Sequence, residues 1–360
     1  MENIPMQLIW KTFLCVFALS VLTQSLKIWN WRSEVQFQTE LSNMKRDMHV
    51  PSLEGFNTQV QQSARPLEAC KKFNRTFPTS MEENMNVVKN YKFTVPTELL
   101  HRLQLDDEGI NTLINRKQNS SIPVIVSGIS DNHFGEFDGL LHSINIHPRK
   151  KYPEIKFIVF DLGLSKAHRA DLQKKCKCDV RTFPFEKFPS HVKRLQGYTW
   201  KPISLQMMLQ EYDFIMWVDS SIRFNEKFNQ LFERARRIGI QILEGDGSIT
   251  VRTHRGLFDF LKEEPCMFNY PEVQPGWFLI KRTKFALKML LRPVVSCALQ
   301  YGCMDFPDAG RFLYCKDPNR PSACHRYDQS VHGIILTRIF NKVRNSITFK
   351  EKEFGSVSRS

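Results

Sequence analysis

Short apolar runs alternate with amphipathic stretches from about residue 121 onward. The apolar runs predict strands, and the stretches with apolar residues at helical spacing predict helices between them. Several runs are apolar on both faces, which is typical of central strands in a mostly parallel sheet. The pattern therefore predicts an α/β fold, with a mostly parallel (mixed) central sheet and helices on both faces. We expect strands over 122–130, 155–165, 179–183, 214–218, 238–245 and 276–281, and helices around 137–144, 166–176 and 200–212.

The N-terminal quarter of the chain has a different character. Residues 12–26 are uncharged and mostly apolar, and a helix extended over residues 8–28 approaches the length of a membrane span. We therefore expect a signal-anchor at 8–28 behind a cytosolic tail at 1–7. Residues 29–90 are polar, which is typical of a stem, and residues 91–350 are then the luminal domain of a single-pass type II membrane protein. A cleaved signal peptide is the alternative, and it predicts a secreted protein.

The cysteine content agrees with an oxidising compartment such as the lumen of the ER or Golgi. An even number of cysteines there favours disulfides. Because only one residue separates Cys176 from Cys178, we expect each to pair elsewhere. A zinc site from Cys315, Cys324 and His325 is an alternative, although the spacing fits no standard zinc motif. Outside the apolar segment the cysteines are Cys70, Cys176, Cys178, Cys266, Cys297, Cys303, Cys315 and Cys324.

The formal net charge is +14 at pH 7, which favours anionic partners. Lys and Arg are scattered along the chain, and no dense basic run like that of a nucleic-acid-binding tail occurs. We therefore expect no nucleic-acid binding, which leaves the membrane surface and phosphorylated or sulfated small molecules. Two glycosylation sequons, beginning at Asn74 and Asn119, are compatible with a luminal domain.

Three aspartates lie at the ends of predicted strands. Asp131 follows the first strand, Asp161 ends the second, and Asp219 follows the fourth. In sheets of this kind, ligands bind beyond the carboxyl ends of the strands. We expect Asp131 and Asp161 beside a nucleotide donor, together with Gly163, which permits close approach of the backbone. For Asp161 the alternative is a tight turn, and for Asp219 it is a cap at the strand end.

The segment Asp219-Ser220-Ser221 is the candidate centre of this site. A nucleotide-sugar donor carries a diphosphate, and Mn²⁺ or Mg²⁺ held by one or two carboxylates and by the phosphates neutralises its charge. Asp219 and Ser221 are candidate metal ligands, and His325 is a further one. Lys201 is a candidate contact of the donor phosphates. Because Ser221 stands where a second acid would be expected, metal affinity should depend on the bound donor.

Candidates for the acceptor side come from later segments. Gly276 would let a sugar pass close to the backbone, and Trp277 would stack on it, unless it is a buried aromatic. Glu244 lies in a glycine-rich turn and is a candidate acid facing the acceptor. Asp328 is a candidate general base that removes the proton of the acceptor hydroxyl. The alternative for Asp328 is a helix start, where an acid interacts favourably with the helix dipole.

Four segments together carry a resemblance to known proteins: FIVFDLGLS (157–165), YTWKPISLQ (198–206), FIMWVDSSIRF (214–224) and CHRYDQS (324–330). Residues 121–340 resemble a GT-A-type glycosyltransferase domain. The sequence is most similar to a nematode-rich family of uncharacterised single-pass type II membrane proteins that carry a domain of unknown function. GT-A enzymes usually have a D-x-D motif where this chain has D-S-S, which bears on metal dependence and on catalysis.

The resemblance implies a Golgi or ER glycosyltransferase. Such an enzyme moves a sugar from a nucleotide sugar, here a UDP-sugar, to a luminal glycan or protein acceptor. The D-S-S departure favours an alternative, a non-catalytic GT-A-like luminal protein that binds a glycan or a partner. A luminal sulfotransferase is a further alternative, for which the segment SGISDN would be a poor phosphate-binding loop.

Overall fold

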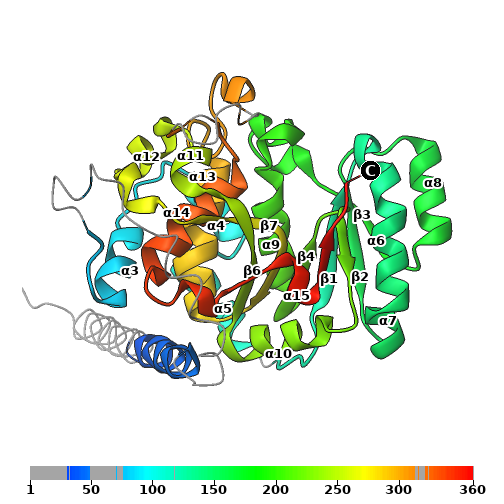
Figure 1. Ribbon diagram of the computed structural model, residues 1–360, viewed down its shortest axis with the longest axis horizontal. Coiled ribbons are helices and arrows are strands. Elements are labelled where there is room, and N and C mark those ends of the chain that lie inside the picture. Colours follow the sequence, from blue (N-terminus) through cyan, green and yellow to red (C-terminus); the bar gives the residue numbers. More distant parts are fainter. Residues whose placement is uncertain are drawn as a thin grey trace, which may run out of the picture.

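The computed structural model describes residues 31, 33–48, 70, 76–116, 118–312, 315, 321–322 and 324–359. A seven-stranded sheet with strand order β3-β2-β1-β4-β7-β6-β8 forms the centre of the molecule (Figure 1). Strands β3, β2, β1 and β4 are parallel, whereas β7 runs antiparallel between β4 and β6. The predicted α/β fold with a mixed central sheet is therefore confirmed. The strands of this sheet are β1 (Val124–Ile129), β2 (Phe157–Asp161), β3 (Asp179–Thr182), β4 (Phe214–Val218), β6 (Ile240–Ser248), β7 (Pro271–Lys281) and β8 (Thr348–Phe349).

Helices cover both faces of the sheet. One face packs against α6 (Phe134–Ile146), α8 (Lys166–Lys175) and α10 (Phe228–Ile238). The other face packs against α9 (Trp200–Glu211), α13 (Arg292–Leu299) and α14 (Asp328–Phe340). The remaining elements are α3 (Met81–Lys89), α4 (Thr97–Arg102), α5 (Asp107–Asn115), α7 (Pro148–Lys151), α11 (Ile249–Arg252), α12 (Arg255–Leu261), α15 (Glu351–Phe354), a π-helix (Ala286–Leu291), and the two-stranded pair β5 (Ile222–Phe224) and β9 (Gly355–Val357).

The apolar run of β4 makes it a central strand. Phe214, Met216 and Val218 pack into the cluster under α6 and α10, and the alternate residues Ile215 and Trp217 pack into the cluster under α9 and α14. All five side chains are buried. Because successive residues of a strand point to opposite faces, an uninterrupted apolar run can be buried only between two helical layers. The carboxyl end of this central strand lies directly before Asp219.

Strand β7 is longer than the sequence predicts and carries a bulge. Ile242 and Leu243, which are adjacent on β6, pair with Phe278 and Gln274 of β7. The three residues of β7 between these partners, with Gly276 in the middle, are extra. Bulges bend a strand and re-aim its side chains, and they are frequent next to active sites.

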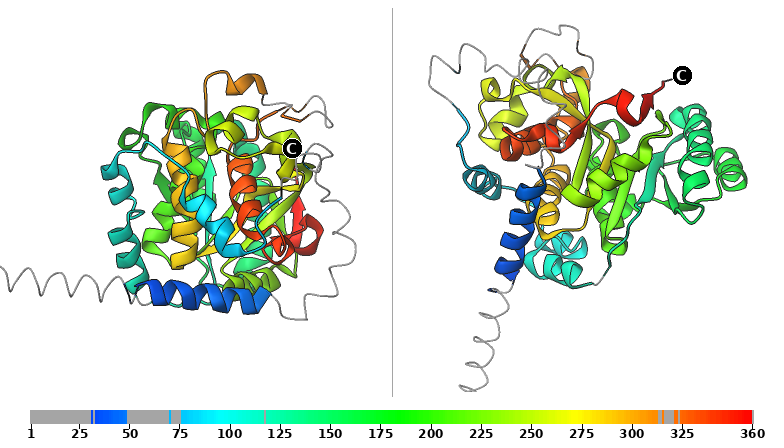
Figure 2. Two further views of the ribbon diagram at one scale, coloured as in Figure 1. Left: turned by 90° about the vertical axis from the view of Figure 1, so that its left-hand side faces the viewer. Right: turned by 60° about the horizontal axis from the view of Figure 1, so that its bottom comes forward.

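The predicted stem at 29–90 contains segments that pack on the domain. Residues 33–48 form a helix, shown in blue in Figure 2, that buries Phe37, Leu41, Met44 and Met48 in the main core. These four residues recur at helical spacing, which accounts for the helix within an otherwise polar stretch. Helix α3 packs against α14. These parts of the stem region thus belong to the folded domain.

The eight cysteines outside the apolar segment form four disulfides: Cys70–Cys266, Cys176–Cys178, Cys297–Cys303 and Cys315–Cys324. The sequence predicts other partners for Cys176 and Cys178, but the structure pairs them with each other. The intervening Lys177 adopts a left-handed backbone conformation (φ 45°), and the two Cα atoms lie 5.1 Å apart, within the range of a disulfide. Among the described residues no helix is both long and apolar enough to cross a membrane, and the predicted signal-anchor at 8–28 lies outside them.

Candidate functional site

Asp219 lies at the carboxyl end of β4 and is held by its neighbours. Its side chain is 37% exposed. Oδ1 accepts a hydrogen bond from Trp217 Nε1 at 2.7 Å, and its backbone N–H donates to the carbonyl of Gly276 at 2.7 Å. The carboxylate therefore has a fixed direction and an accessible side, as the position at the strand end predicts.

Lys201, from the first turn of α9, lies beneath this carboxylate. Its Nζ is 2.9 Å from Asp219 Oδ1 and 3.1 Å from Asp219 Oδ2. Only 3% of the side chain is exposed. Burial lowers the pKa of Lys201, but the charges of Asp219 and Asp328 raise it further, so the net direction is upward and the amine stays protonated. Lys201 is thus placed to orient Asp219, and in this structure it is too enclosed to meet a donor phosphate.

Asp328 is the second carboxylate beside Lys201. Its Oδ2 lies 3.4 Å from Lys201 Nζ, and its side chain is 5% exposed. Burial raises the pKa of Asp328, the negative charge of Asp219 adds to this, and Lys201 opposes it. The structure therefore places Asp328 against the lysine and away from solvent, at the first position of α14 as the helix-start alternative predicts.

Aromatic rings and strained backbone surround the lysine. Its Nζ lies over the rings of Tyr198, Trp200 and Trp217, at 5.4, 6.0 and 5.7 Å from their centroids. Tyr198 (φ 52°) and Tyr327 (φ 45°, ψ −110°) both have positive φ, which is rare for residues other than glycine. Such conformations cluster at functional sites because the surrounding structure must hold them in place. Tyr198 lies three residues before Lys201, and Tyr327 lies directly before Asp328.

Gly276 leaves room for the Asp219 carboxylate. A Cβ atom at Gly276 would lie 2.5 Å from Asp219 Oδ2 and 3.1 Å from Asp219 Cγ. Since Lys201 and Trp217 hold that carboxylate, it cannot move aside freely. The bulge in β7 thus brings the one residue without a side chain opposite Asp219.

Gly276→Ala should displace Asp219 and weaken ligand binding at this site by about tenfold or more, with a loss of about 1–3 kcal/mol in the free energy of unfolding from overpacking. Calorimetric titration with nucleoside diphosphates and urea unfolding measure the two effects. Gly135→Ala is the matched control, because a Cβ at Gly135 would meet nothing within 4 Å. Unchanged binding in Gly276→Ala would contradict the placement of the site beside Asp219.

The predicted metal ligands do not fit a metal site built by the protein. Asp219 is already engaged by Lys201 and Trp217. Ser221 is buried, and its carbonyl accepts the backbone N–H of Ser358. Within the described part of the chain, no three His, Cys, Asp or Glu side chains are grouped in a way that could hold a metal ion. The residues at hand therefore do not supply a Mn²⁺ or Mg²⁺ site of their own.

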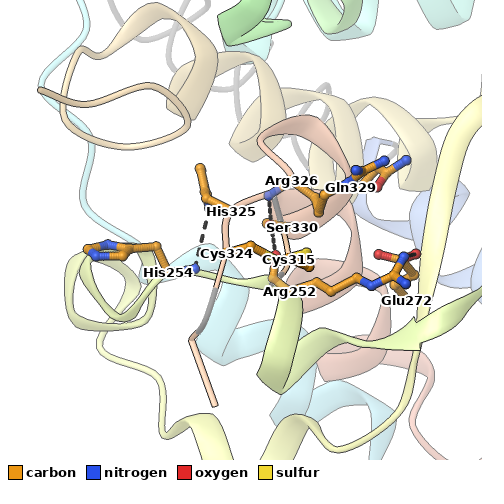
Figure 3. The surroundings of a disulfide bond; sticks show 9 residues. All are labelled: Arg252, His254, Glu272, Cys315, Cys324, His325, Arg326, Gln329 and Ser330. Atoms are coloured by element: carbon orange, nitrogen blue, oxygen red, sulfur yellow. Dashed lines mark hydrogen bonds and ion pairs between the residues drawn. A yellow bond between two sulfur atoms is a disulfide. The ribbon is translucent and has the colours of Figure 1, made fainter. Parts of the chain in front are cut away.

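His325 is enclosed and has both ring nitrogens engaged. Its Nε2 lies 2.9 Å from the carbonyl of Met304, and its Nδ1 accepts the backbone N–H of His254 at 3.4 Å. Figure 3 shows His325 next to the disulfide of Cys315 and Cys324, with the amide of His254 directed at its ring. The disulfide also removes the two thiols that a zinc site at this place would need. His325 is thus a core residue in this structure.

Acid should destabilise the fold through two buried histidines. Burial lowers the pKa of His325 and of His332 to about 4, from 6.5 for a free histidine. Between these values the unfolded chain binds protons that the folded chain does not, so stability is lost as pH falls from 6.5 towards 4, on the order of 3 kcal/mol for each histidine. Urea unfolding at several pH values measures this loss. His325→Gln keeps a donor and an acceptor but does not titrate, so its stability should fall less steeply; an equally steep fall would contradict the assignment.

Asp161 and Asp131 organise the loops at the neighbouring strand ends. Asp161 Oδ1 accepts the backbone N–H groups of Gly163 and Leu164 at 2.8 and 2.7 Å, and its Oδ2 accepts from Arg169. Asp131 Oδ1 accepts the backbone N–H of Ser165 at 2.8 Å. Asp161 therefore acts as the turn cap that was its alternative, whereas Asp131 is half-exposed at the edge of the sheet and also pairs with His168 at 2.8 Å.

The proposed acceptor-side residues, other than Gly276, are engaged elsewhere. Glu244 pairs with the buried Arg344 at 2.9 Å. Trp277 is fully buried, and its ring packs edge-on against Phe224 and Phe349. Because consecutive strand residues face opposite sides, Trp277 points into the core while Gly276 faces Asp219. Neither Glu244 nor Trp277 presents a surface to a ligand in this structure.

Several site residues were not predicted from the sequence. Trp217 looks like an ordinary core residue of β4, yet its indole N–H holds Asp219. Tyr198 and Tyr327 stand out only by their positive backbone φ angles, which the sequence does not show. Arg326 donates to Gln329 at 2.9 Å, and its positive charge acts on both Tyr198 and Glu272. Its place in the unusual CHRYDQS cluster was the one signal in the sequence that could have identified it.

Part of the chain is similar to a known protein family. Residues 67–206 are similar to the family described as "Protein of unknown function (DUF1647)". This range contains Asp131, Asp161 and Lys201, while Asp219 and Asp328 lie beyond it. No curated protein matches the chain.

Solved structures with a similar arrangement of elements include three glycosyltransferases. Core-mannan synthase A from Aspergillus fumigatus, in its Mn/GDP form, has 11% identity and a TM-score of 0.38, with 67% of this chain and 76% of that chain covered. The mannosyltransferase Ktr4p from S. cerevisiae has 8% identity and a TM-score of 0.37, with 76% and 84% covered. Mouse xyloside xylosyltransferase 1 has 13% identity and a TM-score of 0.36, with 63% and 84% covered. Each match is a similarity between structures and assigns no activity to this chain.

Proposed function

We propose that this chain is a glycosyltransferase that moves a sugar from a nucleotide-sugar donor, a UDP-sugar in the first instance, to a glycan or protein acceptor. The reaction breaks the bond between the anomeric carbon and the donor phosphate and forms a bond from that carbon to an acceptor oxygen. The nucleoside diphosphate leaves, and the proton of the acceptor hydroxyl is released. The site for this reaction is the edge of the sheet at Asp219.

One observation carries the proposal. Lys201 and Asp219 come from two consecutive elements, α9 and β4, Asp328 comes from the distant α14, and the two carboxylates meet around the ammonium of Lys201. These are three of the four segments on which the resemblance to GT-A enzymes rests. They converge at the carboxyl end of a central strand, where ligands of α/β sheets bind. A purely structural ion pair would not require two neighbouring tyrosines with positive φ.

Asp219 has the properties of a hydrogen-bond acceptor for sugar hydroxyls. An ionised carboxylate offers several acceptor positions, and Lys201 and Trp217 occupy those on the buried side. The exposed side remains for a ligand. Hydrogen bonds to a charged group held in place are among the stronger polar contacts in proteins. Arg326, two residues before Asp328 on the same segment, is the candidate to meet the donor phosphates.

The cellular setting belongs to the same proposal. The four disulfides of the structure favour an oxidising compartment. Together with the apolar segment at 8–28, they support a Golgi or ER membrane protein whose domain faces the lumen. Protease protection of the domain in intact microsomes tests this placement, and digestion without detergent would contradict it.

A second candidate function is a non-catalytic luminal protein that binds a glycan or a partner. The buried state of Asp328 favours it, because the residue proposed as general base faces Lys201 and not an acceptor. The two candidates share the fold and the binding site. They differ in whether the donor bond is broken.

Calorimetric titration with UDP, GDP and their sugar conjugates, followed by a donor-turnover assay, separates the candidates. The glycosyltransferase proposal predicts binding of at least one nucleotide sugar and release of its nucleoside diphosphate. Binding without release would favour the non-catalytic protein. If no nucleotide or nucleotide sugar binds to the folded full-length protein, the proposed function is wrong.

A further inference from the structure

The Asp219 site already contains a positive charge. Lys201 Nζ lies 2.9 and 3.1 Å from the two oxygens of Asp219 and 3.4 Å from Asp328 Oδ2. One cation thus lies between two carboxylates that come from segments far apart in the sequence, the end of β4 and the start of α14. This is the arrangement in which a bound metal ion would otherwise be expected.

The protein around Lys201 is built to keep this ammonium in place. The faces of aromatic rings attract cations, and the rings of Tyr198, Trp200 and Trp217 lie within 6.0 Å of Nζ. Both carboxylates favour the charged amine, and the side chain is almost wholly enclosed. Removing the ammonium from the site would leave the buried Asp328 without a counter-charge.

We propose that the Lys201 ammonium occupies the cation position at Asp219 and excludes a divalent metal ion from it, while the donor phosphates are left to Arg326, so that nucleotide binding at this site requires no metal. The statement about nucleotide binding rests on the proposed function, whereas the statement about the cation at Asp219 does not. It also accounts for the D-S-S segment, because a site with an internal cation has no use for a second acid at Ser221.

Electrostatic repulsion between the Lys201 ammonium and a divalent ion opposes binding of that ion at Asp219. A divalent ion about 2.1 Å from an Asp219 oxygen would lie within about 5 Å of the ammonium, because the two oxygens are 2.9 and 3.1 Å from Lys201 Nζ. Even with screening as strong as that of water, the repulsion at this distance lowers metal affinity by at least about tenfold, and weaker screening in the partly buried site increases the effect. Both oxygens of the Asp219 carboxylate already contact Lys201, so this carboxylate is a poorer ligand for a metal ion.

Removal of Lys201 should therefore create a metal site. In Lys201→Ala the two carboxylates face a position that the ammonium has vacated, and Mn²⁺ should bind there at least about tenfold more tightly than to the wild-type protein. Loss of the free Mn²⁺ signal in electron paramagnetic resonance measures binding on the full-length protein. Lys175→Ala is the matched control, since Lys175 also lies between two aspartates, Asp138 and Asp171, but on the exposed surface. It should gain no site.

Asp219→Asn identifies where the ion binds. In the double variant Lys201→Ala with Asp219→Asn, the gained Mn²⁺ affinity should disappear. The proposal is overturned if the wild-type protein binds one Mn²⁺ that Asp219→Asn removes. It is also overturned if Lys201→Ala folds, as judged by circular dichroism, and gains no Mn²⁺ affinity.

The wild-type protein provides a test that does not depend on a variant. Its affinity for UDP should be the same, within about twofold, in EDTA and in millimolar Mn²⁺. Binding of UDP only in the presence of Mn²⁺ would overturn the proposal even if Lys201→Ala does not fold. If UDP binds in neither condition, the proposed function fails, whereas the Mn²⁺ resonance of the wild-type and Asp219→Asn proteins still decides whether Lys201 replaces the metal.

Discussion

Asp219→Asn should reduce donor turnover by roughly 30- to 5,000-fold, because truncating one charged partner of a hydrogen-bonded contact costs about 2–5 kcal/mol. The substitution keeps the shape of the side chain but removes the charge that Lys201 and Trp217 hold in place. Stability should change less than activity, since Asp328 still accompanies Lys201. Initial-rate measurements of nucleoside diphosphate release, with urea unfolding in parallel, separate the two effects.

The surface of α8 offers a matched control for this substitution. Asp171 has the same exposure as Asp219, 37%, and it also pairs with a lysine, at 2.7 Å. Asp171→Asn should leave turnover unchanged, because its carboxylate lies on the outer helix and not at the edge of the sheet. Equal activity in Asp219→Asn and Asp171→Asn would contradict the assignment of Asp219 to the donor site.

Glu263→Gln should lower the free energy of unfolding by about 3–5 kcal/mol, the usual effect of breaking a buried ion pair from one side. Arg338 of α14 donates to Glu263 from Nε at 2.8 Å and through a second contact from Nη2, and both side chains are buried. Tyr91 also donates to the same carboxylate at 2.5 Å. The substitution leaves the guanidinium buried against the rings of Phe77 and Phe268 without its counter-charge. Equilibrium urea unfolding measures the loss.

An exposed pair serves as the control for this effect. Arg236 and Glu233 pair on the surface of α10 at 2.6 Å, and Glu233→Gln should cost less than about 1 kcal/mol. Replacing both buried partners, in Glu263→Met with Arg338→Met, should recover much of the lost stability because no unpaired charge remains. A cost below 1 kcal/mol for Glu263→Gln alone would show that the pair does not anchor α14.

The central strands and the position of Asp219 at the end of β4 were predictable because the signals are local. An apolar run that is buried on both faces is visible in the sequence, and so is the acid that follows it. The start of α8 is a local signal as well, since Ser165 precedes it and its side chain accepts the backbone N–H of His168. Helix 33–48 was missed because its four apolar residues lie within a polar stretch, although their spacing is helical.

The contacts of the site were not predictable from local patterns. Lys201, Asp219 and Asp328 were each assigned a separate ligand, whereas the structure places them in contact with one another. The roles of Gly276 and Trp277 depend on the bulge in β7, which changes the pairing with β6. Such features arise from tertiary packing, and a single sequence does not show which side chains it brings together.

The most direct test of the account is a crystal structure of the full-length protein with UDP bound. We predict the nucleotide at the carboxyl ends of β1, β2 and β4, with its ribose hydroxyls next to the exposed side of Asp219 and with Lys201 still between Asp219 and Asp328. Nucleotide bound elsewhere on the fold, or an Asp219 side chain without any contact to it, would contradict the central claim that this carboxylate marks the donor site.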